Sequence, residues 1–311
     1  MADCKICNAS FEDDKGLHHH LKAHKLHVFE YYQTTTPRYD LHDNSLILFK
    51  NKKQYFDTDF NSVKNMRLWL DKQTPEKRMD YLKSVLLKRK DEKKLIYTPT
   101  QVELRSLKIP GVKYYNQVFE NYYTFCESLG FKNKYTFPKK IILKNIFEDS
   151  AAKIYIDTRE QLPLEFDCPT EVKTLSFGDY SFSLSEKVGR CYIERKSLND
   201  FIGTLSGGFE RFENEIIRAK DAKANLVILV EDELNNAVKF NILEHIYKKG
   251  MKVTPEYVFH NVRELIQKYE HIQFLFVKNR EEASKMVKRL FSNPNQVKKI
   301  DLQYYYDTGL L

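Results

Sequence analysis

The sequence opens with two cysteines and two histidines at a spacing that strongly limits how the segment can fold. The pattern is Cys-x2-Cys-x12-His-x3-His, formed by Cys4, Cys7, His20 and His24. Two thiolates and two imidazoles supply a closed tetrahedral zinc site, which is the structural kind. The alternative is a chance pair of thiols beside a solvated histidine cluster. We therefore predict that the first thirty residues fold around one Zn²⁺ ion.

The residues between these ligands support the same interpretation. Phe11 and Leu17 stand where a small ββα unit needs apolar side chains beside the metal, and His20 and His24 lie on one helix face. Residues 1–30 closely resemble a C2H2 zinc finger. The resemblance implies DNA contact, because such fingers read about three base pairs each. A finger that contacts protein, or that is purely structural, is the alternative.

Composition restricts the class of protein and of partner. The 311 residues suggest two or three domains, and 42% hydrophobic residues suffice for packed cores. The net charge of +8 favours a polyanionic partner such as nucleic acid. The five cysteines, an odd number with one close pair, fit a reducing intracellular compartment. No apolar run approaches the about 18 residues of a membrane span, and the first residues do not resemble a secretory signal.

A mainly helical region is expected over residues 37–148. Apolar spacing over 63–70 and 79–87 predicts two amphipathic helices. Residues 83–94 carry six basic and two acidic side chains, which form either a solvated helix face or a phosphate-contacting stripe.

The second half of this region contains turn and cap signals. Thr100 with Glu103 predicts a helix start, Pro110-Gly111 breaks the chain, and a further helix over about 114–129 is expected to end at Gly130. The pattern is similar to the small repeats attached to homing endonucleases. That resemblance implies a DNA-binding module, and an ordinary helical hairpin between domains is the alternative.

From residue 151 on, strand-like and helix-like patterns alternate. The expected strands cover 152–158, 171–177, 180–184, 190–196, 225–231 and 272–277. The expected helices begin after Ser197 and cover about 209–223, 255–269 and 281–291. This alternation predicts an α/β domain with a central mixed sheet over 151–295, followed by a C-terminal tail, 296–311.

Carboxylates and one lysine are concentrated in the middle of this domain. Asp179 and Glu194 could hold Mg²⁺ if their strands are neighbours, because Mg²⁺ usually takes one or two protein carboxylates plus water and substrate oxygens. Glu194 and Lys196 point the same way from one strand, so the ammonium could orient water or stabilise phosphate charge. Asp157 and Asp200 can reach the same edge. Such a group is suited to phosphodiester hydrolysis.

Three ordered motifs make this pattern more specific. They are Asp157-x-Arg159-Glu160, Gly178-Asp179-Tyr180 and Glu194-Arg195-Lys196-Ser197-x-x-Asp200. Taken singly, the carboxylates could belong to a turn or to a surface ion pair of little energetic value. Together, with the helix GGFERFENEIIR, they resemble the XPF/ERCC4-type nuclease domain over about residues 153–291. The resemblance implies a restriction-endonuclease-like fold, dependence on Mg²⁺ or Mn²⁺, and cutting of DNA.

The resemblance also implies roles for single residues. The expected catalytic set is Asp157, Asp179, Glu194, Lys196 and Asp200, with Asp179 and Glu194 as magnesium ligands. The expected substrate-binding set is Arg159, Arg195 and Arg211. Of the neighbouring groups, Arg159, Glu160 and Arg195 would either order the site or contact phosphate.

These observations predict a Mg²⁺-dependent endodeoxyribonuclease in which the finger and the helical module aid structure-selective or site-selective recognition. The alternative is a non-catalytic DNA-binding or recombination-complex subunit. We find no tandem helix-hairpin-helix module after the domain, which leaves branch preference open, as well as a homodimer or a protein partner. The module combination suggests a phage or mobile-element protein of DNA repair or recombination. It would act in the host cytoplasm, or in the nucleus if eukaryotic, without a membrane partner.

Overall fold

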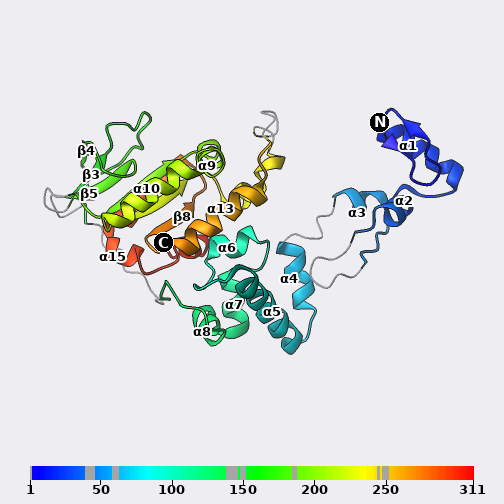
Figure 1. The fold of residues 1–311 in the computed structure, drawn as a ribbon, viewed down its shortest axis with the longest axis horizontal. Helices are drawn as coiled ribbons and strands as arrows, with labels where there is room; N and C mark the ends of the chain where they lie inside the picture. Colours follow the sequence, from blue (N-terminus) through cyan, green and yellow to red (C-terminus); the bar gives the residue numbers. More distant parts are fainter. Residues whose placement is uncertain are drawn as a thin grey trace. The chain divides into compact units, whose positions relative to one another are not determined.

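The computed structural model describes residues 2–38, 46–57, 63–137, 146–147, 152–183, 188–243, 246 and 252–311 (Figure 1). They fall into two compact units, residues 1–74 and residues 75–311. None of the described helices is long and apolar enough to cross a membrane.

The first unit begins with the ββα arrangement expected of a finger. Its elements are β1 (Ala2–Asp3), β2 (Ser10–Phe11), α1 (Asp14–His20), the 3-10 helix η1 (Leu21–His24), α2 (Val28–Thr35), α3 (Lys52–Asp57) and α4 (Val63–Asp71). The strands β1 and β2 pair antiparallel. Asp13 caps α1 by accepting a hydrogen bond from the Gly16 amide at 2.8 Å. The small core combines buried residues from the finger and from α2.

The second unit begins with a helical segment. Its helices are α5 (Pro75–Lys93), α6 (Gln101–Ser106), α7 (Val112–Phe119) and α8 (Tyr122–Ser128). The two amphipathic helices predicted from periodicity are confirmed as α4 and α5. The predicted helix start is confirmed as well: Thr100 caps α6 and forms a capping box with Glu103.

The single helix predicted over about 114–129 is wrong, because the chain breaks between α7 and α8. Glu120 has a φ of 61°. The side chain of Asn121 accepts hydrogen bonds from the amides of Tyr123 and Thr124. An asparagine that caps its own backbone competes with helix continuation, and this local competition outweighs the helical periodicity on either side. Gly130 has a φ of 78°, as expected for the residue that ends α8.

A six-stranded mixed sheet forms the centre of the second unit. Its strands are β3 (Lys153–Ile156), β4 (Thr170–Val172), β5 (Tyr180–Ser183), β6 (Cys191–Lys196), β7 (Asn225–Val230) and β8 (Ile272–Phe276). Their order is β4-β3-β5-β6-β7-β8. β5 runs antiparallel to β3 and β6, whereas β6, β7 and β8 are parallel. The sheet predicted from the alternating pattern is thus confirmed.

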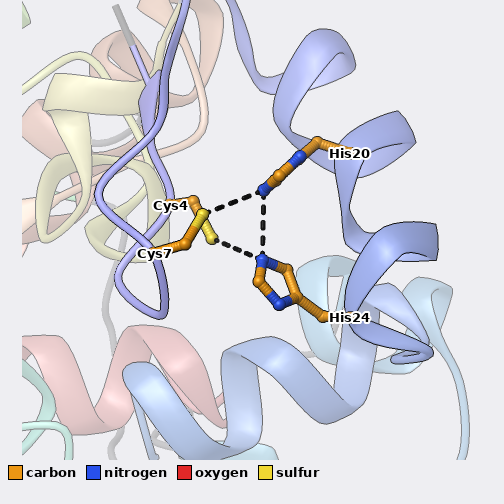
Figure 2. A group of neighbouring side chains, drawn as sticks. All are labelled: Cys4, Cys7, His20 and His24. Carbon is orange, nitrogen blue, oxygen red and sulfur yellow. Dashed lines mark hydrogen bonds between the residues drawn. The ribbon is translucent and has the colours of Figure 1, made fainter.

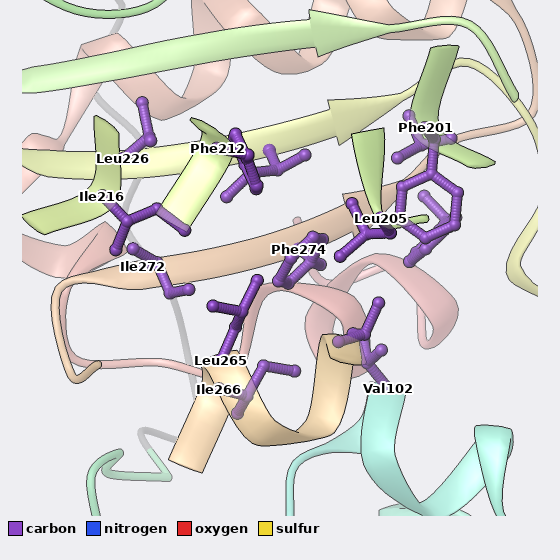
Figure 3. Packing of buried hydrophobic residues seen from close by; sticks show 14 of the residues in the cluster. Val102, Phe201, Leu205, Phe212, Ile216, Leu226, Leu265, Ile266, Ile272 and Phe274 are labelled. Atoms are coloured by element: carbon purple, nitrogen blue, oxygen red, sulfur yellow. The ribbon is translucent and has the colours of Figure 1, made fainter. Parts of the chain in front are cut away.

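Helices cover this sheet and complete its core. They are α9 (Leu198–Thr204), α10 (Phe209–Asp221), α11 (Leu234–Ala237), η2 (Phe240–Ile242), α13 (Pro255–Lys268), α14 (Arg280–Ser292), α15 (Pro294–Val297) and α16 (Leu302–Asp307). Buried side chains of α9, α10 and α13 pack with those of β7 and β8, and Val102 of α6 joins them (Figure 3). β7 is buried on both faces, as its continuous apolar run predicts.

The segment predicted as a C-terminal tail, 296–311, holds the end of α15 and the whole of α16. Gln303 of α16 accepts a hydrogen bond from the Phe276 amide at 2.7 Å and donates one to the Phe276 carbonyl at 3.3 Å. It thereby satisfies backbone groups of the outermost strand, β8. Asp301 accepts a bond from the Gln101 amide at 2.6 Å, which ties α6 to the same segment. The predicted boundary between residues 148 and 151 lies outside the described residues and stays a prediction.

Candidate active site and metal centre

The four residues predicted as zinc ligands meet in the first unit. Figure 2 shows their side chains converging from the β1–β2 turn and from the helical segment. Sγ of Cys4 lies 3.5 Å from Nε2 of His24, and Sγ of Cys7 lies 3.2 Å from Nε2 of His20. The two Nε2 atoms are 3.1 Å apart, and all four ligand atoms lie within 4.8 Å of one another. Tetrahedral zinc bonds of about 2.0 Å to nitrogen and about 2.3 Å to sulfur require spacings close to these.

The turn that carries the cysteines is held by backbone bonds. The amide of Asn8, whose φ is 61°, donates to the Cys4 carbonyl at 2.7 Å. Burial opposes ionisation of Cys4, but hydrogen bonds, first of all from the Cys7 and Ile6 amides, outweigh it and lower the pKa of the thiol. The thiolate is the form that binds a metal, so the local chemistry fits zinc.

The predicted carboxylate pair lies at one position in the sheet of the second unit. Asp179 directly precedes β5 and Glu194 lies in β6, so the two are on neighbouring antiparallel strands. The amide of Arg195 donates to Oδ2 of Asp179 at 2.7 Å. Nζ of Lys196 lies 2.8 Å from Oε1 of Glu194, on the side of the strand opposite to Arg195. The Glu194 and Lys196 side chains therefore lie together on one side of β6, as the period of two predicts, and the Asp179 carboxylate bonds to the β6 backbone beside them.

Gly178 permits this close approach of the two strands. Its φ is +58°, and a Cβ atom there would lie 2.7 Å from the Ile193 carbonyl oxygen. The next residue, Asp179, donates its amide to that same oxygen at 2.8 Å. A side chain at position 178 would strain the backbone and displace the carboxylate that follows it.

A third acid, Glu215 of α10, shares the electrostatic environment of the pair. Burial raises the pKa of Glu215, and the negative charge of Glu194 raises it further. Burial, followed by the charge of Glu194, raises the pKa of Asp179 to about 7. Three partly buried carboxylates thus lie near Lys196, and the charges of Arg159 and Arg218 also act on them. Carboxylate oxygens gathered in this way are the ligands that suit a hard divalent cation.

Sequence reasoning did not assign Glu215 to the site. A signal was available, because Glu215 lies three residues after Phe212 and one before Ile216, both buried on the face of α10 that packs on the sheet. An acid next to the buried residues of α10 points toward the sheet on which this helix packs.

Asp157 lies beside the pair, but other groups occupy its carboxylate. Its amide donates to the Asp179 carbonyl at 2.8 Å, which places it at the expected edge. Oδ2 accepts from the Leu175 amide at 2.6 Å, and Oδ1 accepts from Nε of Arg159 at 2.6 Å. Burial opposes these bonds, which nevertheless lower the pKa of Asp157. The visible role of Asp157 is to order the two segments that flank the site, and its catalytic role stays a prediction.

Arg195 is held by acids inside the protein. Its guanidinium bonds both oxygens of Glu160, at 2.9 and 3.1 Å, and lies 3.2 Å from Glu231. Only 13% of the Arg195 side chain is exposed. Burial disfavours its charge, but Glu160 and Glu231 together raise its pKa. In this arrangement Arg195 orders the loop after β3, and its predicted phosphate contact stays untested.

The remaining predicted residues lie nearer to solvent. Asp200 is exposed in the first turn of α9 and accepts a hydrogen bond from the Ser197 hydroxyl at 2.6 Å. Arg211 is exposed in the first turn of α10, and the Arg159 side chain is 68% exposed. The side chain of Arg159 is thus far more exposed than that of Arg195, and Arg211 is exposed as well.

A large cavity lies elsewhere in the second unit. It measures about 990 Å³ and is lined by α14, the segment 164–167 and residues 309–311. The described residues that line it include none of the predicted catalytic set. The predicted catalytic residues Asp179, Glu194 and Lys196 lie instead at one end of the interior strands β5 and β6.

Part of the second unit is similar to known proteins. Residues 156–290, from the end of β3 into α14, match the ERCC4 domain. No curated protein matches the chain. Among solved structures, XPF from Aeropyrum pernix, alone and in complex with DNA, is 18% identical with a TM-score of 0.34 in both cases. Each alignment covers 47% of this chain, and 68% and 65% of the respective solved chains. The segment 156–290 therefore has an ERCC4 nuclease-like fold, with a central mixed sheet and helices.

Proposed function

We propose that this chain is a divalent-metal-dependent DNA endonuclease that hydrolyses phosphodiester bonds. The observation that carries the proposal is the meeting of Asp179, Glu194 and Lys196 at one end of the neighbouring strands β5 and β6, inside the segment that matches the ERCC4 domain. Glu215 of α10 lies near the same residues, and its raised pKa reflects burial and the neighbouring charge of Glu194. Carboxylate oxygens gathered at one place favour a hard divalent cation.

Each residue of the site has a distinct task in this proposal. Asp179 and Glu194 would hold Mg²⁺ or Mn²⁺. When bound, such an ion stabilises the negative charge that develops on the phosphate and promotes ionisation of the attacking water. Lys196, fixed by its 2.8 Å bond to Glu194, orients the water or stabilises phosphate charge.

The surrounding residues would order the site and contact the DNA backbone. Asp157 holds the segment before β5 in place, and Asp200 adds a carboxylate at the start of α9. The exposed Arg159 and Arg211 would contact phosphates, which are the main source of affinity for DNA.

We propose zinc as the ion of the first unit. We also propose that the finger aids DNA binding without recognising three successive base pairs. Its helix begins at Asp14, so the positions that usually contact bases are Asp13, Gly16 and His19. Asp13 already caps the helix and Gly16 has no side chain. Only His19 remains for reading a base. The helical segment 75–137, with the basic stretch of α5, is the better candidate for contact with the duplex.

Cleavage of DNA by the zinc-loaded full chain tests this function. Supercoiled plasmid, linear duplex, flap and fork DNAs would be incubated with Mg²⁺, or with EDTA. We expect metal-dependent cutting that Asp179→Asn and Lys196→Met each reduce by about 10²-fold or more. Asp221→Asn, an exposed acid at the end of α10, is the matched control and should cut like wild type.

The preferred substrate would separate branch-selective from site-selective recognition. Binding of DNA without cutting of any substrate, by a folded and zinc-loaded protein, would contradict the enzyme proposal. The non-catalytic DNA-binding role would then replace it.

A further inference from the structure

The helix that follows the finger packs into the core of the metal-binding unit. α2 begins at Val28, after His27, whose amide donates to Glu30 at 2.7 Å. Tyr31 of α2 is 2% exposed and lies in one buried cluster with Cys4, Leu17 and Leu21. A thirty-residue finger needs only its own β-hairpin and helix to surround the metal, so α2 is an addition to that minimal unit.

The Tyr31 hydroxyl bonds to the backbone on both sides of Cys4. The Lys5 amide donates to the hydroxyl oxygen at 2.9 Å, and the hydroxyl donates to the Asp3 carbonyl at 3.4 Å. A phenol can serve as acceptor and donor at once, and here it uses both functions on the turn that carries a ligand. Without the hydroxyl, the Lys5 amide would lose this partner beside a buried aromatic ring.

We propose that Tyr31 is a positioning residue of the Cys4/Cys7/His20/His24 metal site, and that α2 belongs to the metal-binding unit. The inference rests on the zinc assignment made above. Groups that hold a ligand's backbone reduce the freedom that metal binding must remove, so they raise metal affinity. By the same linkage, bound metal stabilises the docked position of α2, and loss of the metal loosens this helix.

Tyr32 offers a matched control within the same helix. Its hydroxyl lies 3.0 Å from Nε2 of His18, which is not one of the four ligands, and its ring stacks on Tyr55. Tyr31→Phe and Tyr32→Phe each remove one hydroxyl and keep the ring. A difference between the two variants therefore reports the contact with the ligand turn rather than a general loss of packing.

The test is zinc affinity of the full chain, measured by competition with a chromophoric chelator for wild type, Tyr31→Phe and Tyr32→Phe. We expect Tyr31→Phe to bind zinc about 10-fold more weakly or worse, and Tyr32→Phe to resemble wild type. Hydrogen exchange of the α2 amides should accelerate on zinc removal. In Tyr31→Phe these amides should exchange faster than in wild type even with zinc bound.

Three results would overturn the proposal, and they are distinguishable. Equal affinity of wild type and Tyr31→Phe would show that the hydroxyl does not position the ligand turn. Equal weakening in both variants would assign the effect to packing of α2. Failure of wild type itself to bind zinc would refute the zinc assignment, and the proposal with it.

Discussion

Replacing Arg195 with leucine tests whether this arginine stabilises the folded site or binds a DNA phosphate. In the structure its guanidinium is paired with Glu160 and Glu231, and the three side chains are 13%, 6% and 13% exposed. Removing one partner of a buried ion pair costs about 3–5 kcal/mol, because an uncompensated charge remains. Glu231 keeps a second partner, Arg280, at 3.4 Å, so Glu160 bears most of the loss. We therefore expect a cost near the lower limit, about 3 kcal/mol.

Thermal unfolding at neutral pH measures this cost. For a unit of this size, a loss of about 1 kcal/mol lowers Tm by about 2–4 °C, so Arg195→Leu should unfold about 6–12 °C below wild type. Lys153→Leu is the control, since its pair with Glu171 is 45% and 44% exposed and should contribute about 0–1 kcal/mol. A stability loss below about 1 kcal/mol, together with weakened DNA binding, would refute the ordering role and favour direct phosphate contact.

Three further perturbations follow from the structure. Cys126 and Cys191 are buried, and burial raises the pKa of each to about 12, so iodoacetamide should leave both unmodified in the folded chain. Zinc removal should make the finger thiols of Cys4 and Cys7 reactive without changing Cys126 or Cys191, and modification of either buried cysteine, detected by mass spectrometry, would contradict this. Burial raises the pKa of Asp301 from 3.8 to about 7, so the fold prefers the protonated acid and loses stability as pH rises from about 4 to about 7. The stability of Asp301→Asn relative to wild type should therefore increase between pH 5 and pH 8 by about 2 kcal/mol, and a pH-independent difference in urea unfolding would contradict this. Gly178→Ala should cost at least about 1–2 kcal/mol, because φ is +58° and the new Cβ would meet the Ile193 carbonyl; unchanged unfolding would show that the backbone relaxes freely.

Local patterns allowed much of this fold to be predicted. The spacing of the finger ligands is short, and the structure brings their four ligand atoms within 4.8 Å. The period of two in β6 separates the Arg195 side chain from those of Glu194 and Lys196, and the structure shows this separation. The alternation of strands and helices likewise led to the mixed sheet. In each case the determining residues form a short motif of fixed spacing or follow from a simple period.

The features that were not predicted depend on interactions between distant segments, or on a side chain that competes locally with the continuation of a helix. Glu160 and Arg195 are 35 residues apart, and only the packed loop after β3 reveals that they pair. Glu215 reaches the site because α10 packs on the sheet, which periodicity does not position. The break at Glu120 arises from the cap at Asn121, which competes with an otherwise continuous helical pattern.

The central claim is a divalent-metal site at Asp179 and Glu194. Binding of Mn²⁺ to the zinc-loaded chain tests this claim most directly, because it examines these carboxylates without requiring the right DNA substrate. Electron paramagnetic resonance of free Mn²⁺ would be recorded during titration of wild type, Asp179→Asn and the control Asp221→Asn. We predict that wild type and the control bind Mn²⁺ and that Asp179→Asn binds it at least about 10-fold more weakly, since one of two ligand carboxylates is gone. Equal binding by all three proteins would contradict a metal centre at Asp179 and Glu194.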